Sequence, residues 1–79
     1  MNTQALKGIV HTDPESMGGV PVFVGTRVPV ESLFDHLKAG DSIDGFLDGF
    51  PSVKREQVLK VLEVVEHEML PLCGLRASA

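Results

Sequence analysis

Two prolines, Pro21 and Pro29, stand at the two ends of the most strand-prone stretch of this chain. The residues between them are mostly β-branched or aromatic, and only Gly25 and Arg27 interrupt them. Because proline donates no hydrogen bond to a neighbouring strand, two short strands joined at Gly25-Thr26 must be edge strands or strand ends. A free two-stranded ribbon is only marginally stable in water. We therefore expect the ribbon to lie on a helical core or to pair with another chain.

The remaining two thirds of the sequence predicts three helices. Leu33, Phe34 and Leu37 recur at helical spacing, and Gly40 follows as a stop. A second, short helix is predicted to start with a cap at Asp41 or Ser42 and to end before Pro51.

The third helix is predicted to be the longest, starting near 52–54 and closing at Pro71. Its apolar residues recur at positions i, i+3, i+4, i+7 and i+11, which indicates a face turned toward a core. They are Val58, Val61, Leu62, Val65 and Met69. Leu59 and Val64 widen this stripe, which suggests a second contact.

The fold class expected from this pattern is mainly α (α+β), with a short N-terminal β-ribbon followed by three helices. The second and third helices are joined by Phe50-Pro51-Ser52 and can form a helix-turn-helix. The 79 residues make a single domain, 1–79, with a ribbon arm at about 8–29, a three-helix bundle at about 30–70 and a tail at 71–79. The expected core residues are Leu33, Phe34, Leu37, Ile43, Phe46, Leu47, Phe50, Val58, Val61, Leu62 and Val65.

Composition narrows the class of protein. A chain of this size buries too little surface to be very stable alone, and a single cysteine, Cys73, cannot form an internal disulfide. Self-association or an unusually good core is therefore expected. No apolar run approaches the roughly 20 residues that cross a bilayer, and the first residues do not resemble a signal peptide, so we expect a cytoplasmic protein without membrane contact. The net charge of −4 argues against indiscriminate binding to nucleic acid but allows a local basic patch.

Lys54 and Arg55 are the first candidates for such a patch. If the last helix is a recognition helix, its first turn enters the major groove, where two cations can contact phosphates or a guanine edge. Both cations oppose the dipole at a helix N-terminus. The alternative is a solvated pair of charges at a helix start, offset by Glu56.

Arg27 is the second candidate, because Gly25 and Thr26 favour a tight turn that presents its guanidinium. Its role is either phosphate contact or an ion pair with Asp13 or Glu15 that fixes the loop.

Carboxylates and histidines recur at helical spacing, as in Asp44 with Asp48 and Glu63 with His67. Such pairs can hold a metal ion, but on small acidic proteins they are nearly always solvated helix faces. We expect no catalytic residue, no metal and no cofactor. A small metal-dependent hydrolase using the aspartates is the least favoured alternative.

The first third of the chain, which is rich in proline and glycine, also resembles a known protein family. It reads Asp13-Pro14, then Gly18-Gly19-Val20-Pro21-Val22-Phe23-Val24-Gly25-Thr26-Arg27-Val28-Pro29-Val30. This order resembles the signature of a widespread small prokaryotic family, the domain-of-unknown-function family numbered four hundred thirty-three. The similarity extends over about residues 9–69, through Ala39-Gly40, Phe50-Pro51-Ser52-Val53 and the last helix.

The resemblance implies a homeodomain-like helix-turn-helix and an antitoxin of VapB type, which neutralises a PIN-like ribonuclease toxin and binds its own operator DNA as a dimer. Gly25, Thr26 and Arg27 match the family motif. Many members cap the last helix with Thr or Ser where this chain has Lys54, with an acidic partner three residues on. Here Gln57 stands at that partner position, so we expect this cap to be missing and Ser52 to serve from upstream.

Our first functional hypothesis is therefore a dimeric antitoxin and operator-binding repressor. Arg27, Lys54 and Arg55 would contact DNA. The ribbon would dimerise or dock on the toxin through Val22, Phe23, Val24, Gly25, Thr26 and Val28. The alternative is a protein-binding module without a DNA role, which the net charge and the acidic last helix favour.

Overall fold

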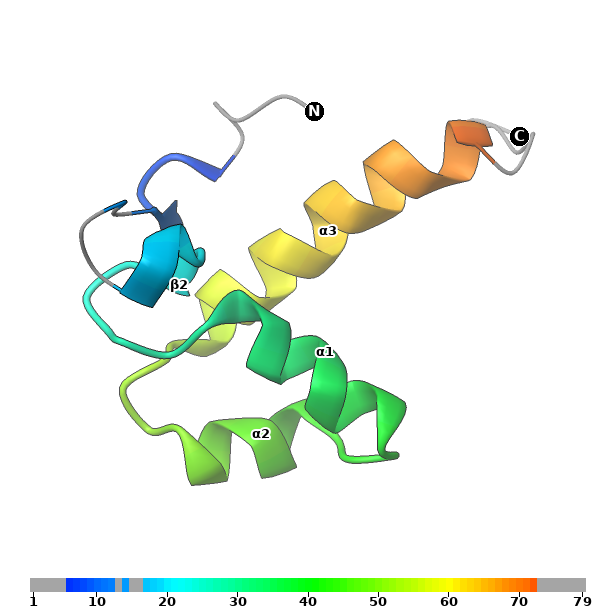
Figure 1. The fold of residues 1–79 in the computed structure, drawn as a ribbon. Coiled ribbons are helices and arrows are strands. Elements are labelled where there is room, and N and C mark those ends of the chain that lie inside the picture. Colours follow the sequence, from blue (N-terminus) through cyan, green and yellow to red (C-terminus); the bar gives the residue numbers. More distant parts are fainter. Residues whose placement is uncertain (1–5, 13, 15–16, 73–79) are drawn as a thin grey trace.

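The structure is a computed structural model that describes residues 6–12, 14 and 17–72. In this part of the chain a small ribbon is followed by three helices, as the sequence predicts (Figure 1). The elements, in chain order, are β1 (Val10–His11), the 3₁₀ turn η2 (Met17–Gly19), β2 (Val22–Phe23), α1 (Val30–Lys38), α2 (Ile43–Gly49) and α3 (Arg55–Leu72).

The ribbon contains the strand pair that we predicted, in a short form, and a second pair that we did not predict. Across Gly25 an antiparallel bridge joins Val22 to Pro29, the N–H of Phe23 donates to the carbonyl of Val28 at 3.1 Å, and the N–H of Val30 donates to the carbonyl of Pro21 at 3.0 Å. This pairing ends here because α1 begins at Val30. On its other side β2 pairs antiparallel with β1, with Val10 opposite Phe23 and His11 opposite Val22.

The first two helices begin and end where local signals place them. Gly40 has a φ of 94°, and the N–H groups of Gly40 and Asp41 donate to the carbonyls of Leu37 and His36. This pattern is the Schellman motif, which closes α1 as predicted. Of the two candidate caps for α2, Ser42 is the one used, because its Oγ accepts from the N–H of Gly45 at 3.0 Å.

The start of α3 corrects our expectation that its cap is missing. The Oε1 atom of Gln57 accepts the N–H of Lys54 at 2.9 Å, which is the second half of a capping box. No hydrogen bond from Ser52 is needed, and the helix begins at Arg55. At its other end α3 passes through Pro71 to Leu72, one residue beyond the predicted stop.

The core lies where the ribbon meets the three helices. The Phe23 side chain is fully buried, and its ring centroid lies 6.2 Å from that of Phe46, which in turn lies 4.9 Å from that of Phe50. The ribbon is therefore part of the core and not a projecting arm. The central cluster consists of Phe23, Leu33, Phe46, Val53, Val58 and Val61. The predicted core residues outside this cluster are half-buried against it, and Phe23 and Val53 are core residues that were not predicted.

α3 reaches beyond the other elements. Its 18 residues span about 27 Å, and the second half of the helix extends past α1 and α2 (Figure 1). None of the helices in the described ranges is long and apolar enough to cross a membrane.

Candidate functional site

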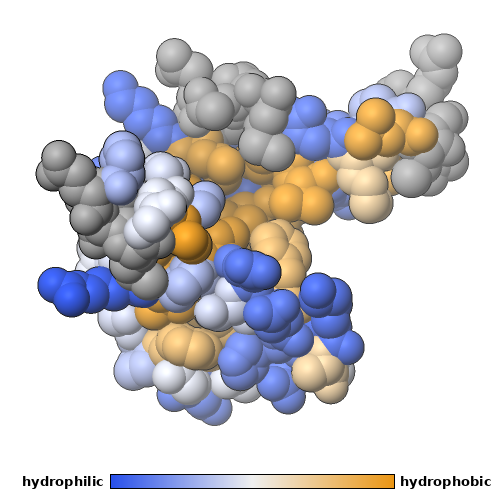
Figure 2. Space-filling model, viewed as in Figure 1, coloured by the Kyte–Doolittle hydropathy of each residue, from blue (hydrophilic) through white to orange (hydrophobic). Residues whose placement is uncertain are grey.

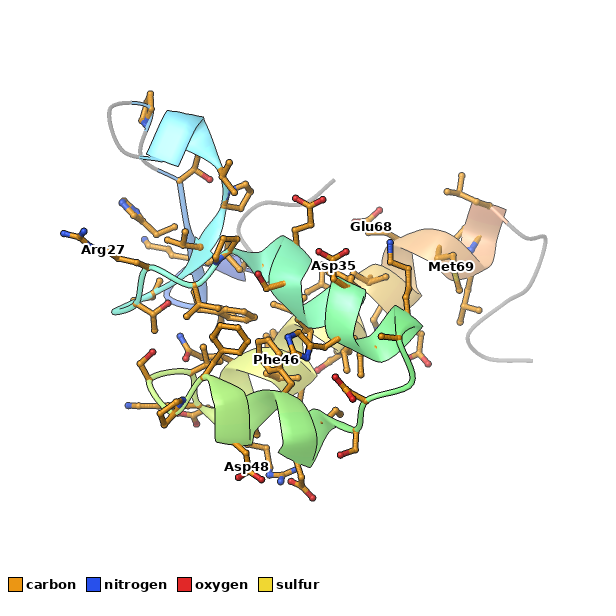
Figure 3. The ribbon with its side chains drawn as sticks, turned by 60° about the horizontal axis from the view of Figure 1, so that its bottom comes forward. Arg27, Asp35, Phe46, Asp48, Glu68 and Met69 are labelled. Atoms are coloured by element: carbon orange, nitrogen blue, oxygen red, sulfur yellow. The ribbon has the colours of Figure 1, made fainter. Side chains whose placement is uncertain are left out.

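The Gly25 turn presents Arg27 to solvent. Gly25 has a φ of 80°, as the third residue of a type II turn requires, and the N–H of Thr26 donates to the carbonyl of Phe23. The Thr26 hydroxyl donates to the same carbonyl at 2.9 Å and accepts the N–H of Val28 at 3.0 Å. Thr26 therefore fixes the turn, while the Arg27 side chain points outward (Figure 3).

A buried glutamine joins this turn to the start of α3. Gln57 is 6% exposed, and its Nε2 donates to the carbonyl of Val24 at 3.1 Å and lies 3.5 Å from that of Ile9. Its Oε1 accepts from Lys54, so the amide links the two loops of the ribbon to the helix cap. We did not predict this role. The available signal was that Gln57, Val61 and Val64 follow one another at i, i+4 and i+7 on the core face.

A polar notch of about 310 Å³ marks the junction. It is lined by residues of the Gly8 turn, the Gly25 turn and the start of α3, including Lys54, Glu56 and Gln57 but not Arg27. The structure thus brings the two basic features that the sequence suggested separately, the Arg27 turn and the first turn of α3, to one end of the molecule. Lys7, which precedes Gly8, is also exposed.

The three predicted cations differ in their surroundings. Arg55 forms an ion pair with Asp44 of α2, so its charge is partly offset and α2 is tied to α3. For the side chains of Arg27 and Lys54, the described part of the chain supplies no ion-pair partner. The alternative that Arg27 pairs with Asp13 or Glu15 lies outside the described residues. Both cations can contact phosphate oxygens.

The predicted partner ribbon is only partly accessible. Val22 and Phe23 are buried in the core of this chain, so their side chains offer nothing to a second protein. Val24 and Gly25 are exposed, and Thr26 and Val28 are half-buried. The exposed tip remains a predicted contact.

Several of the aspartates and one histidine, His36, have structural partners. Nδ1 of His36 lies 2.8 Å from Oδ2 of Asp41, and the imidazole ring packs edge-on against Phe46 and Phe50. Asp44 holds Arg55. Within residues 6–12, 14 and 17–72, no three His, Cys, Asp or Glu side chains gather as metal ligands would.

We expect Gly25→Ala to lower the free energy of unfolding by about 1–2 kcal/mol, because a Cβ at Gly25 meets no atom within 4 Å and only the positive φ resists it. Urea denaturation followed by circular dichroism measures this change. Gly49→Ala is the matched control, since its Cβ also meets open space but its φ is not positive. The control should be neutral or stabilising. If both variants lose the same free energy of unfolding, the positive φ of Gly25 is not the cause of the loss.

Comparison with known proteins identifies the family of this chain. The family described as "Protein of unknown function (DUF433)" matches residues 10–63. The "Uncharacterized protein y4eO" of Sinorhizobium fredii (strain NBRC 101917 / NGR234) is 38% identical over 72 residues, which are 91% of this chain and 32% of that protein. The chain thus spans about a third of the length of this relative. No solved structure matches the chain. The extent of the family match, from β1 into the middle of α3, shows that the chain belongs to the DUF433 family.

Proposed function

We propose that this protein is an antitoxin that binds its own operator DNA as a dimer and neutralises a PIN-like ribonuclease toxin. The observation that supports DNA binding is that Gln57 joins the Gly25 turn, which carries Arg27, to the first turn of α3 at Lys54. The antitoxin role is what the family resemblance implies. Such a protein acts in the cytoplasm, where it meets its operator.

The arrangement of α2 and α3 fits this role. The two helices are joined by residues 50–54, and the first turn of the second helix of such a pair is the part that enters the major groove. Arg55 stands in that turn with its guanidinium held by Asp44. A guanidinium held in one orientation loses less freedom on contacting a guanine edge, whereas Arg27 and Lys54 are placed to contact the DNA backbone.

The charges are distributed unevenly along α3. Downstream of its first turn the helix carries Glu63, Glu66 and Glu68 against Lys60. DNA would repel this acidic part, so only the start of α3 and the Arg27 turn can approach the duplex. Each monomer would therefore make few phosphate contacts, and its affinity for random DNA should be low.

We expect a fluorescence-anisotropy titration to show tighter binding to the upstream promoter of this gene than to a random duplex at the same salt concentration. The double variant Arg27→Ala/Lys54→Ala should reduce the slope of log K against log salt by about two units per monomer. Lys38→Ala is the matched control, because Lys38 is an exposed cation at the end of α1 that pairs with Asp35. Equal affinity for promoter and random DNA, or an equal loss in the control, would contradict operator binding.

The second candidate, a protein-binding module without a DNA role, is favoured by the exposed acidic side chains Glu63 and Glu66 on α3. A basic surface around a ribonuclease active site would attract them. Co-purification with the product of the adjacent gene, together with promoter binding no tighter than random binding, would support this candidate over the first.

A further inference from the structure

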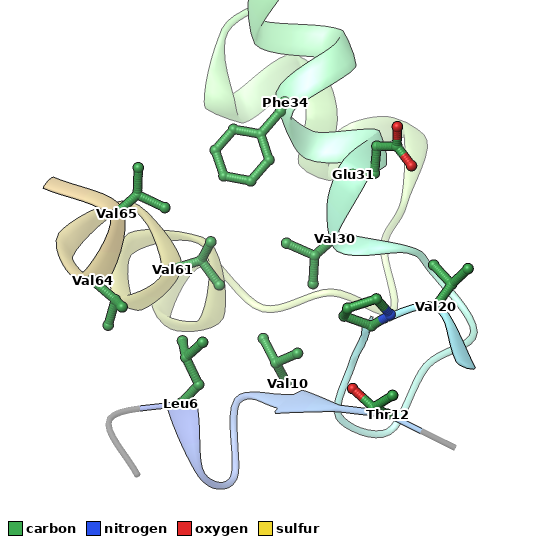
Figure 4. A pocket seen from close by; sticks show the side chains of 11 residues that line it. Leu6, Val10, Thr12, Val20, Val30, Glu31, Phe34, Val61, Val64 and Val65 are labelled. Carbon is green, nitrogen blue, oxygen red and sulfur yellow. The ribbon is translucent and has the colours of Figure 1, made fainter. Parts of the chain in front are cut away.

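An apolar groove runs along the side of α3, away from the polar notch. It has a volume of about 520 Å³ and lies between the N-terminal segment, the start of α1 and the middle of α3 (Figure 4). Its walls are almost entirely aliphatic or aromatic, and Thr12 and Glu31 are its polar lining residues. Representative residues of the walls are Leu6, Val10, Val30, Phe34, Val61 and Val65. Figure 2 shows hydrophobic residues gathered in the angle between α3 and the rest of the molecule.

The same helix carries an apolar ridge beyond the groove. Val65, Met69 and Leu72 follow at i, i+4 and i+7, which continues the core-facing stripe into the part of α3 that extends past the body. Met69 is 48% exposed and Leu72 is 87% exposed. The chain thus presents a ridge next to a groove on one helix.

We propose that a second copy of this chain fills the groove, with the two α3 helices antiparallel and the ridge of each copy seated in the groove of the other. Ridge and groove on one chain can satisfy each other reciprocally only about a two-fold axis. On α3 the groove is lined by Val61, Val64 and Val65, and the ridge is centred near Met69, so the axis between them passes close to Val65. This inference names the interface of the dimer in the proposed function, and it rests on that proposal for the existence of a dimer.

The volume of the groove fits a second copy. A cavity of about 150 Å³ is the space left by one large aliphatic side chain, so a groove of about 520 Å³ has room for Met69 and Leu72 of the second copy, since Val65 itself lines the groove. At 100° per residue, Glu63 lies on the side of α3 opposite Val65 and Leu72, whereas Glu66 lies 60° from Met69 and flanks the ridge. Antiparallel pairing about Val65 therefore keeps Glu63 away from the contact and leaves the two exposed Glu66 carboxylates at its edge.

The spacing of the two basic ends also fits. Lys54 lies eleven residues before Val65. At 1.5 Å per residue the two copies of Lys54 would stand about 33 Å apart along the helices. Half-sites on B-DNA repeat at about 34–36 Å, one helical turn. The dimer therefore predicts an operator with two half-sites about ten base pairs apart, centre to centre.

Light scattering of the full chain after size exclusion tests the interface without DNA. We expect a mass twice the 8.5 kDa of one chain. Met69→Glu should weaken the dimer at least about 100-fold, because each dimer would bury two unpaired carboxylates. Leu59→Glu is the matched control: Leu59 is 49% exposed on the same helix but faces away from the ridge, and this variant should change the dissociation constant by less than about threefold.

Cross-linking tests the position of the axis. Val65→Cys in a Cys73→Ser background should form a disulfide-linked dimer on mild oxidation, whereas Leu59→Cys in the same background should not. A wild-type monomer at 100 µM or above, as when another segment of the same chain fills the groove, would overturn the proposal. So would a dimer that Leu59→Glu disrupts and Met69→Glu does not. A dimer that ignores its promoter would refute the proposed function and leave the interface standing.

Discussion

Phe46→Ala is expected to lower the free energy of unfolding by about 3–5 kcal/mol. The Phe46 side chain is fully buried, and its ring packs against Phe23 of the ribbon, His36 of α1 and Phe50. Its removal leaves a cavity at the point where ribbon, α1 and α2 meet. A 79-residue chain has about 4–12 kcal/mol of stability in total, so the loss would unfold a substantial share of the molecules at 37 °C.

Urea denaturation at 15 °C, followed by circular dichroism, measures this change against two reference variants. Phe46→Leu keeps an apolar side chain in the same space and should cost less than about 1.5–2 kcal/mol. Leu59→Ala removes a side chain that is half exposed and should cost under about 1 kcal/mol. If Phe46→Ala costs no more than Leu59→Ala, the aromatic cluster is not the centre of the core.

The proposed dimer makes the stability measured in this experiment depend on protein concentration. If two copies share a groove, stability depends on protein concentration, because association favours the folded state. The loss in Phe46→Ala should then be compared with wild type at one fixed concentration. If the loss of unfolding free energy in Phe46→Ala is the same at every protein concentration, it arises from the core of the monomer. If the urea midpoint of the wild type rises with protein concentration, the interface contributes to stability.

The helices were predictable because their signals are local. Gly40 closes α1 and Ser42 caps α2 through hydrogen bonds to residues three to five positions away. Such signals stand in the sequence itself. The pairing across Gly25 was predicted and forms as a short bridge, but β1 was not predicted, because a strand of two residues has almost no pattern to indicate it.

The candidate site was predictable only in its separate parts. Arg27 and Lys54 were selected from turn and helix signals, but their convergence depends on Gln57, which bonds to residues 33 and 48 positions earlier in the chain. Pairing over such separations cannot be derived from spacing. The same is true of Asp44, which reduces the free charge of Arg55 across the turn between α2 and α3. In this protein the sequence indicated which residues carry charge, and the tertiary fold decides which charges remain available.

Gln57→Leu is expected to lower the free energy of unfolding by about 2–4 kcal/mol, or the melting temperature by roughly 10–20 °C. Leucine fills most of the same space but leaves the carbonyl of Val24 and the N–H of Lys54 without their partner. Each unpaired buried group costs about 1–3 kcal/mol. Lys54→Ala is the control, because it removes an exposed side chain and keeps the N–H that Gln57 caps, so it should cost under about 0.5 kcal/mol.

Gln57→Glu separates the two halves of this interaction through pH. An ionised carboxylate can still accept from Lys54 but faces the carbonyl of Val24, so burial and this oxygen should raise the pKa of the new carboxyl in the folded state. A raised folded pKa means that the variant approaches wild type below the unfolded pKa of about 4.3 and falls behind it as pH rises. The measurement is the difference in unfolding free energy between variant and wild type at pH 4 and pH 7.

The same variants connect the fold to the proposed function. If Gln57 holds the Arg27 turn beside Lys54, then Gln57→Leu, assayed at a temperature where it is folded, should bind promoter DNA more weakly although no charge has changed. The slope of log K against log salt should fall by about one unit, as one phosphate contact is lost. A destabilised variant with an unchanged slope would show that Gln57 supports the fold alone and that the cations act independently of it.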